Sequence, residues 1–231
     1  MGTLPKWATG RIMVALVSLG TLIDKVPSKL RKAHLENNEA NWDSYKAAYP
    51  TDRFIEHQRY LDKLLFGKRT SYSERFIGSW TDGDSIKASA NSCEVISVHS
   101  AMIAIRGQEV ETFPRLLALF EKNGAVLGAN AGSSFEHMKK HLKEYGFSPK
   151  LYIVKKLKDS DYKELMTEYN TYILSIWNGN TMGEGLHSMC ITCENGQYIL
   201  HNAYGHGRVT DNLKDTIYSY SANPITLIAV K

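Results

Sequence analysis

One cysteine of this chain stands where a thiol could act as a nucleophile. Cys93 follows Asn91 and Ser92 and precedes an apolar run that continues to Ile105 with helical spacing. Asn91 as N-cap and Glu94 three residues later match a capping box, which predicts a helix that begins at about Ser92. The positive end of a helix stabilises a thiolate, so this position favours a reactive cysteine. The alternative is that Cys93 is a small buried residue, as most free cysteines are.

A nucleophilic cysteine needs a general base and a group that orients the base, and both occur near the C-terminus. Two alternating segments flank Asn195-Gly196, a dipeptide typical of a two-residue β-hairpin turn. With that turn, His187 lies diagonally from Asn202 on one face, whereas His201 points to the other face. An Asn202 amide that accepts from the imidazole would fix its tautomer and leave the second ring nitrogen for the thiol. The pattern therefore predicts Cys93 as nucleophile, His187 as general base and Asn202 as orienting residue.

Helices precede strands in the part of the chain that carries these residues. Helices are expected at about 92–105 and within 111–124, 132–146 and 159–170. Strands are expected at about 151–154, 171–177, 186–193, 197–204 and 225–230. This order predicts an α+β fold in which helices pack against a C-terminal antiparallel sheet.

The residues before this region have a different composition. They are polar, and the segment RFIEHQRYLDKLLF, residues 53–66, carries apolar residues at helical spacing. A stretch rich in Gly, Ser, Thr and Asp then ends near Asp84 and predicts a linker. We therefore expect an N-terminal helical extension over residues 1–83 and a catalytic domain over residues 84–231. The extension could cover the site as a propeptide does, or it could extend the substrate site.

Composition limits the partners. The 231 residues are 43% hydrophobic and 23% charged, close to the average of globular proteins. The net charge of +4 is too mild to predict a nucleic-acid partner. The apolar stretch at residues 12–23 is too short for an integral membrane segment and lacks a small-x-small cleavage site. The cytoplasm is therefore favoured, secretion stays open, and the sequence leaves the oligomeric state open.

The other two cysteines, Cys190 and Cys193, form a CxxC pattern within an alternating strand. Residues three apart on a strand point to opposite faces, so the two sulfurs are not expected to share a metal ion or a disulfide. We expect neither a metal site nor a cofactor.

The combined pattern resembles the papain-like cysteine peptidases, most closely the compact bacterial C39-like group. A cysteine starts a helix, helical sequence follows, and a histidine opens a hairpin about 15 residues before an asparagine. The segment GANAGSSFEHMKKHLKEYGFSP is also similar to that group's Gly-rich turn and following helix. The resemblance covers roughly residues 84–231. It implies a papain-like fold, a peptide or protein substrate, and a triad of Cys93, His187 and Asn202 that works through a thioester.

One residue departs from the family pattern. Those families usually place a glutamine about six residues before the cysteine to bind the oxyanion, and Lys87 stands there. The Cys93 backbone N–H remains available, and the Asn91 amide is a second candidate donor. The departure leaves two alternatives to a peptidase or amidase open: a catalytically silent module that binds peptides, and a cysteine-dependent acyltransferase or transpeptidase.

Overall fold

The computed structural model describes residues 26–50, 53–68, 85–123, 134–177, 186–204, 209–221 and 223–231. Residues 69–84 of the expected linker and the boundary at Asp84 lie outside the described residues, whereas the ends of the linker, Gly67–Lys68 and Ser85, are strand. The apolar stretch at residues 12–23 and the glycine-rich residues 128–133 also lie outside the described residues.

A five-stranded antiparallel sheet occupies the C-terminal half, with the strand order β3-β7-β4-β5-β6. Its strands are β3 (Lys150–Ile153), β4 (Thr171–Trp177), β5 (Leu186–Glu194), β6 (Gln197–His201) and β7 (Pro224–Val230). A short helical turn, η2 (Val154–Lys156), follows β3. The chain is therefore α+β, with helices toward its N-terminus and the sheet toward its C-terminus, as the sequence predicts.

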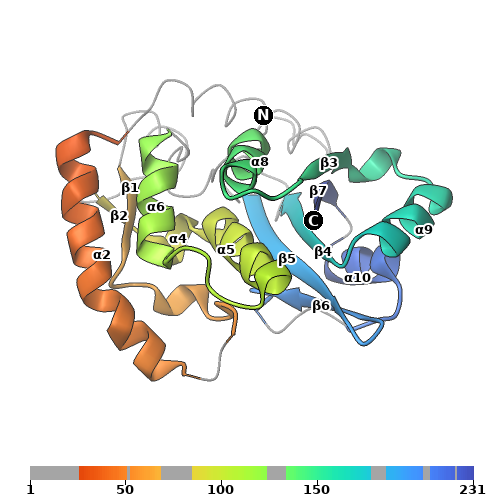
Figure 1. Ribbon diagram of the computed structural model, residues 1–231, viewed down its shortest axis with the longest axis horizontal. Helices are drawn as coiled ribbons and strands as arrows, with labels where there is room; N and C mark the ends of the chain where they lie inside the picture. The colour runs from red at the N-terminus through yellow and green to blue at the C-terminus, as the bar shows by residue number, and fades with distance from the viewer. Residues whose placement is uncertain are drawn as a thin grey trace, which may run out of the picture.

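Helices cover both faces of this sheet (Figure 1). The first face carries α5 (Cys93–Arg106) and α8 (Phe135–Glu144), with α6 (Phe113–Lys122) packed on α5, and the second carries α9 (Asp159–Glu168) and α10 (Leu213–Tyr220). The period of two along a strand divides the core accordingly. Leu186 and Cys190 of β5 belong to the core shared with α5, whereas Met189 and Ile191 belong to the core shared with α10.

The hairpin between β5 and β6 has the predicted register. Cys190 pairs with His201 and Ile191 with Leu200. Asn195 and Gly196 form its turn with φ angles of 52° and 78°, as a type I′ turn requires. This register fixes the face on which each functional side chain of the hairpin lies.

The described N-terminal residues pack on the same core as α5. They form α2 (Ser28–Ala48), η1 (Gln58–Tyr60) and β1 (Leu65–Lys68), and β1 pairs antiparallel with β2 (Ser85–Lys87), which leads into α4 (Ala88–Asn91). Figure 1 shows α2 beside α6 at one end of the molecule. Leu61, Leu64 and Phe66 lie in the core cluster that includes α5.

The prediction of a helix within residues 53–66 is wrong. Its apolar residues Phe54, Ile55, Leu61 and Leu64 are buried, but Tyr60 is 48% exposed. A single short helical turn and then strand β1 bury these side chains. Tertiary packing against α2, α4 and α6 therefore overrides the helical spacing.

The helices predicted within residues 111–124 and 132–146 are confirmed as α6 and α8. Pro114 lies in the first turn of α6, and the Ser134 side chain caps α8 by accepting from the His137 N–H. Helix α10 was not predicted, although Asn212 is a typical N-cap and accepts from the backbone N–H groups of Lys214 and Asp215. Among the described residues, no helix is both long enough and apolar enough to span a bilayer.

Candidate active site around Cys93 and His187

Cys93 is the first residue of α5, and its side chain rests on the start of strand β5. The thiol lies 3.7 Å from the Leu186 carbonyl oxygen, and the Ser188 backbone N–H also lies against the sulfur. Leu186 and Ser188 flank His187 in the strand. The helix therefore places the sulfur against the backbone on both sides of the histidine.

Burial governs the electrostatics of this thiol. Cys93 is 4% exposed, and its thiol donates a hydrogen bond to Glu94 Oε2 over 3.2 Å. Burial, and then the Glu94 carboxylate, raise the pKa of the Cys93 thiol well above its ordinary value. The helix terminus was expected to lower this pKa. That expectation is wrong, because the first turn of α5 lies inside the core, where desolvation of a thiolate outweighs the helix dipole.

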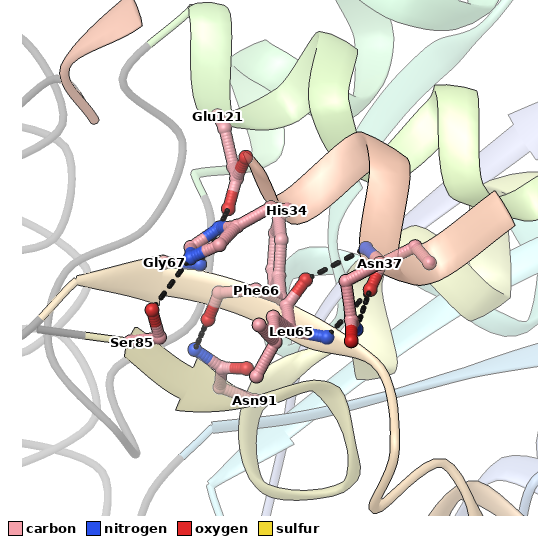
Figure 2. A network of polar contacts seen from close by, with 9 residues as sticks. His34, Asn37, Leu65, Phe66, Gly67, Ser85, Asn91 and Glu121 are labelled. Atoms are coloured by element: carbon pink, nitrogen blue, oxygen red, sulfur yellow. Dashed lines mark hydrogen bonds and ion pairs between the residues drawn. The ribbon is translucent and has the colours of Figure 1, made fainter. Parts of the chain in front are cut away.

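Asn91 does not cap helix α5. It is the last residue of α4, Ser92 precedes α5, and no side chain caps the helix. Figure 2 shows the Asn91 amide nitrogen donating to the Phe66 carbonyl of β1, over 3.1 Å. The predicted capping box is therefore wrong, and the role of Asn91 at the oxyanion stays a prediction.

His187 is the second residue of β5 and is held in one orientation. Its Nε2 lies 2.9 Å from the backbone carbonyl oxygen of Asn202. Its ring stacks on Tyr204, with 5.0 Å between the ring centroids, and contacts Tyr220 of α10. A carbonyl oxygen only accepts hydrogen bonds, so Nε2 carries the proton and Nδ1 carries the lone pair. Burial lowers the pKa of His187 to about 4, and the ring is neutral at pH 7.

Asn202 contacts His187 as predicted, but through a different atom. The backbone carbonyl, rather than the side-chain amide, accepts from the imidazole. The Asn202 side chain instead donates through Nδ2 to Gln58 Oε1 over 2.9 Å. The reason is local: Asn202 comes directly after β6 with φ at 61°, a left-handed conformation that turns its backbone toward the histidine.

Among the described contacts, the thiol and the imidazole have different hydrogen-bond partners and none to each other: the thiol contacts Glu94 and Leu186, and the imidazole contacts Asn202. By the strand period of two, the His187 side chain lies on the α10 side of β5, whereas Cys93 approaches from the α5 side. Tyr204 and Tyr220 both pack on the His187 ring. Burial, and then the nearby Cys93 thiol, raise the pKa of both tyrosines. The structure therefore gathers Cys93, His187 and the backbone of Asn202 at the beginning of β5.

His201 contacts residues other than His187. This agrees with the prediction of Asn202, rather than His201, as the partner of His187. Its Nδ1 lies 2.5 Å from Glu56 Oε1, and its Nε2 lies 2.8 Å from the Thr192 hydroxyl. Glu56 and Gln58 are the residues of this region that sequence reasoning missed. Gln58 lies 144 positions before Asn202, and no local spacing in the sequence connects two segments so far apart.

The CxxC cysteines lie on opposite sides of the sheet, as predicted. Cys190 belongs to the core under α5, Cys193 packs against the core under α10, and both are free thiols. Within the described ranges, no group of three or more His, Cys, Asp or Glu side chains is placed to hold a metal ion.

A second polar network lies away from the candidate site, between α2, α6 and β1 (Figure 2). His34 contacts Glu121 through Nδ1 at 2.6 Å and the Ser85 hydroxyl through Nε2 at 2.7 Å. This order of hydroxyl, imidazole and carboxylate is that of a hydrolase triad. We assign it a structural role, because His34 and Glu121 are each 1% exposed and Glu121 also accepts the Gly67 backbone N–H.

No protein-family model matches the chain, and no curated protein matches it. The resemblance to papain-like peptidases therefore depends on the sequence pattern alone.

Proposed function

We propose that this chain is a thiol-dependent hydrolase of peptide or amide bonds. The observation that carries the proposal is the position of Cys93: the first residue of a helix, packed against the backbone on both sides of His187, whose Nε2 is held by Asn202. A nucleophile beside a base, and a base with a fixed tautomer, are the parts that covalent acyl transfer needs. The resemblance to papain-like peptidases supports the same reaction and a papain-like fold.

The reaction starts from a neutral thiol and a neutral imidazole. For attack, the Cys93 thiol leaves Glu94 and passes its proton to Nδ1 of His187 while the sulfur bonds to the substrate carbonyl carbon. The tetrahedral intermediate then expels the amine, which takes the proton from Nδ1 as the C–N bond breaks. Water, deprotonated by His187, hydrolyses the thioester and restores the thiol.

The start of α5 supplies the electrostatic part of this reaction. The first N–H groups of a helix have no intrahelical partner and point toward an anion at its end. The Cys93 backbone N–H is the donor for the oxyanion, and the Asn91 amide is the proposed second donor. Loss of one such donor lowers the rate roughly a hundred- to a thousandfold. A substitution of Asn91 therefore tests whether its amide is the second donor.

The proposal is tested with unfolded polypeptides as substrates. A denatured protein mixture is incubated with wild type and with Cys93→Ala, and new amino termini are identified by mass spectrometry. New termini that appear with wild type and are absent with Cys93→Ala support the hydrolase. Equal patterns for the two chains would overturn it. An added amine that captures the acyl group instead of water would identify the acyltransferase alternative.

The protonated thiol favours one second candidate function. Since Cys93 donates to Glu94 and its pKa is raised, the same residues could form a catalytically silent module that binds peptides. Lys87, at the position where the family usually has a glutamine, also favours this binding module. Peptides that are retained equally by wild type and Cys93→Ala, and cleaved by neither, would favour this module over the hydrolase.

A further inference from the structure

We propose that Glu56 and Gln58 are positioning residues for His187, so that the segment before β1 is part of the active centre rather than a removable cover. This inference rests on the proposed hydrolase, because it names residues that organise the same site. Neither residue touches the thiol or the imidazole in the described contacts. They act through Asn202, whose carbonyl holds the histidine.

Glu56 fixes the backbone at the point where strand β6 ends. Its Oε2 accepts the Asn202 backbone N–H at 2.6 Å, and its Oε1 pairs with Nδ1 of His201 at 2.5 Å. One carboxylate therefore binds two consecutive residues of the hairpin. The N–H and the carbonyl of Asn202 are separated only by the φ and ψ torsions of that residue. Holding the N–H while φ stays at 61° therefore limits where the carbonyl can point.

Gln58 holds the side chains of the same loop. Its Oε1 accepts from Asn202 Nδ2 at 2.9 Å and from the Tyr204 hydroxyl at 3.3 Å. Its Nε2 donates to the Ser89 carbonyl of α4 at 3.2 Å. Gln58 is 3% exposed, so this amide connects the His187 loop to the turn before Cys93 inside the core.

The backbone of this loop requires such support. Asn202 and Tyr204 have φ angles of 61° and 51°. Asparagine tolerates the left-handed region, but a residue as large as tyrosine is strained there and keeps this conformation only when its surroundings enforce it. Tyr204 also stacks on His187, so relaxation of the loop would remove both the ring contact and the carbonyl partner of the imidazole.

The tautomer of His187 is the direct readout. Nitrogen-15 NMR of the full-length chain distinguishes a ring protonated at Nε2 from one protonated at Nδ1. We expect the wild type to carry the proton on Nε2, and Glu56→Leu and Gln58→Met to show a mixture. Glu56→Gln keeps an oxygen for the Asn202 N–H and an amide that can donate to His201, so it should keep the wild-type tautomer.

Activity gives the second readout. If the hydrolase proposal holds, Glu56→Leu and Gln58→Met should lower kcat about a hundredfold with KM unchanged, because they misplace the base without changing substrate contacts. Glu56→Gln should retain kcat within a few-fold. If Glu56→Leu does not fold, Gln58→Met makes the same test from η1.

A matched control comes from another histidine that is paired with a glutamate. Glu109 lies 3.0 Å from Nε2 of His99, and its loss in Glu109→Leu should leave the His187 tautomer and kcat unchanged. A wild-type tautomer in both Glu56→Leu and Gln58→Met would overturn the proposal, and so would an equal change in Glu109→Leu. A chain with the expected tautomers but no hydrolysis would refute the proposed function and leave the positioning role standing.

Discussion

Burial keeps the Cys93 thiol and the His187 imidazole of the candidate site uncharged. It raises the pKa of the Cys93 thiol and lowers the pKa of His187 to about 4. In the proposed reaction, the resting site therefore holds a protonated thiol and a neutral imidazole, and the proton moves only when the sulfur attacks. Such a site has a low background of thiolate, since free thiolate forms only at high pH.

Glu94 contributes to the raised pKa of the thiol, and its removal should make Cys93 more reactive. Glu94→Gln keeps the size of the side chain and removes the negative charge next to the sulfur. The pKa of the Cys93 thiol should fall, so the pH midpoint for alkylation by iodoacetamide should move to a lower pH. Peptide mapping assigns the labelled cysteine. Glu109→Gln serves as the control, and an unchanged midpoint in Glu94→Gln would show that burial alone sets this pKa.

The pH dependence of the reaction should follow His187. A general base works only when it is unprotonated, so kcat/KM should stay high down to about pH 4 and fall below it. An ordinary histidine would place this acid limb near its unperturbed pKa of about 6.5. Hydrolysis of an activated ester, measured across this range, distinguishes the two. A limb at the higher value would mean that His187 is not desolvated when it acts.

For single residues, the sequence predicts which residues contact each other better than it predicts which of their atoms do. The hairpin turn is a local signal, and it correctly predicts that His187 and Asn202 come into contact. The capping pattern at Asn91 is wrong, although a helix does begin at Cys93. The sequence does not distinguish the backbone carbonyl of Asn202 from its amide, because a left-handed φ angle decides between them. Glu56 and Gln58 reach the site through tertiary packing, which leaves no periodic signal.

Among the elements, the hairpin β5–β6 determines whether His187 can face Asn202. A shift of one residue in register would move every side chain of β6 to the other face of the sheet. The turn at Asn195 and Gly196 fixes this register through two left-handed residues. The sequence could predict this, because Asn-Gly is a strong local signal for a type I′ turn.

Gly196→Ala should therefore destabilise the chain through conformation alone. A Cβ on Gly196 would meet no atom within 4 Å, but its φ angle of 78° is unfavourable for alanine. We expect the free energy of unfolding in urea to fall by about 1 kcal/mol. Asn195→Gly keeps a residue suited to a positive φ angle and should change it little. Equal stability of wild type and Gly196→Ala would contradict a left-handed turn at this position.

The elements that sequence patterns miss are those that tertiary contacts shape. Residues 53–66 have helical spacing, yet they form one short turn and β1, because most of their apolar side chains are buried in the core cluster that several other elements share. The opposite error concerns α10, which the periodicity does not predict because the helix has only eight residues, although Asn212 is a typical N-cap.

At the scale of the whole molecule, a network of buried hydrogen bonds connects α2 to α6 and β1. Glu121 of α6 accepts from His34 of α2 and from the Gly67 backbone N–H of β1. Asn38 of α2 adds a pair of hydrogen bonds to Leu65, one to its carbonyl and one from its N–H. Three elements far apart in the sequence therefore share one set of buried hydrogen bonds.

Removal of Glu121 should loosen this end of the molecule. Glu121→Ala leaves the buried His34 and the Gly67 N–H without their acceptor, so the free energy of unfolding should fall by about 3 kcal/mol. Hydrogen exchange should accelerate most in α2. Glu39→Ala is the matched control, since Glu39 pairs with Arg115 between the same two helices but at the surface, where such a pair contributes little. Similar losses in the two variants would contradict a special role for the buried network.

The overall plan is the level that the sequence predicts best. The order of segments predicts helices packed on an antiparallel sheet. It does not predict that helices cover both faces, which the uninterrupted burial of β4 shows. The packing of α2 on the core cannot be predicted from a pattern of apolar residues, because its buried face carries His34, Asn38 and Trp42, two of which are polar. Their burial becomes intelligible only with their partners on other elements.

Acylation of Cys93 tests the central claim most directly, because it requires both the nucleophile and its base. The full-length wild type and His187→Ala are mixed with p-nitrophenyl acetate at neutral pH, and peptide mapping locates the acetyl group and follows its formation. The account predicts a thioester on Cys93 that forms about a hundredfold faster in wild type than in His187→Ala, with Cys190 and Cys193 unmodified. Equal rates in the two chains, or no acetyl group on Cys93, would contradict it.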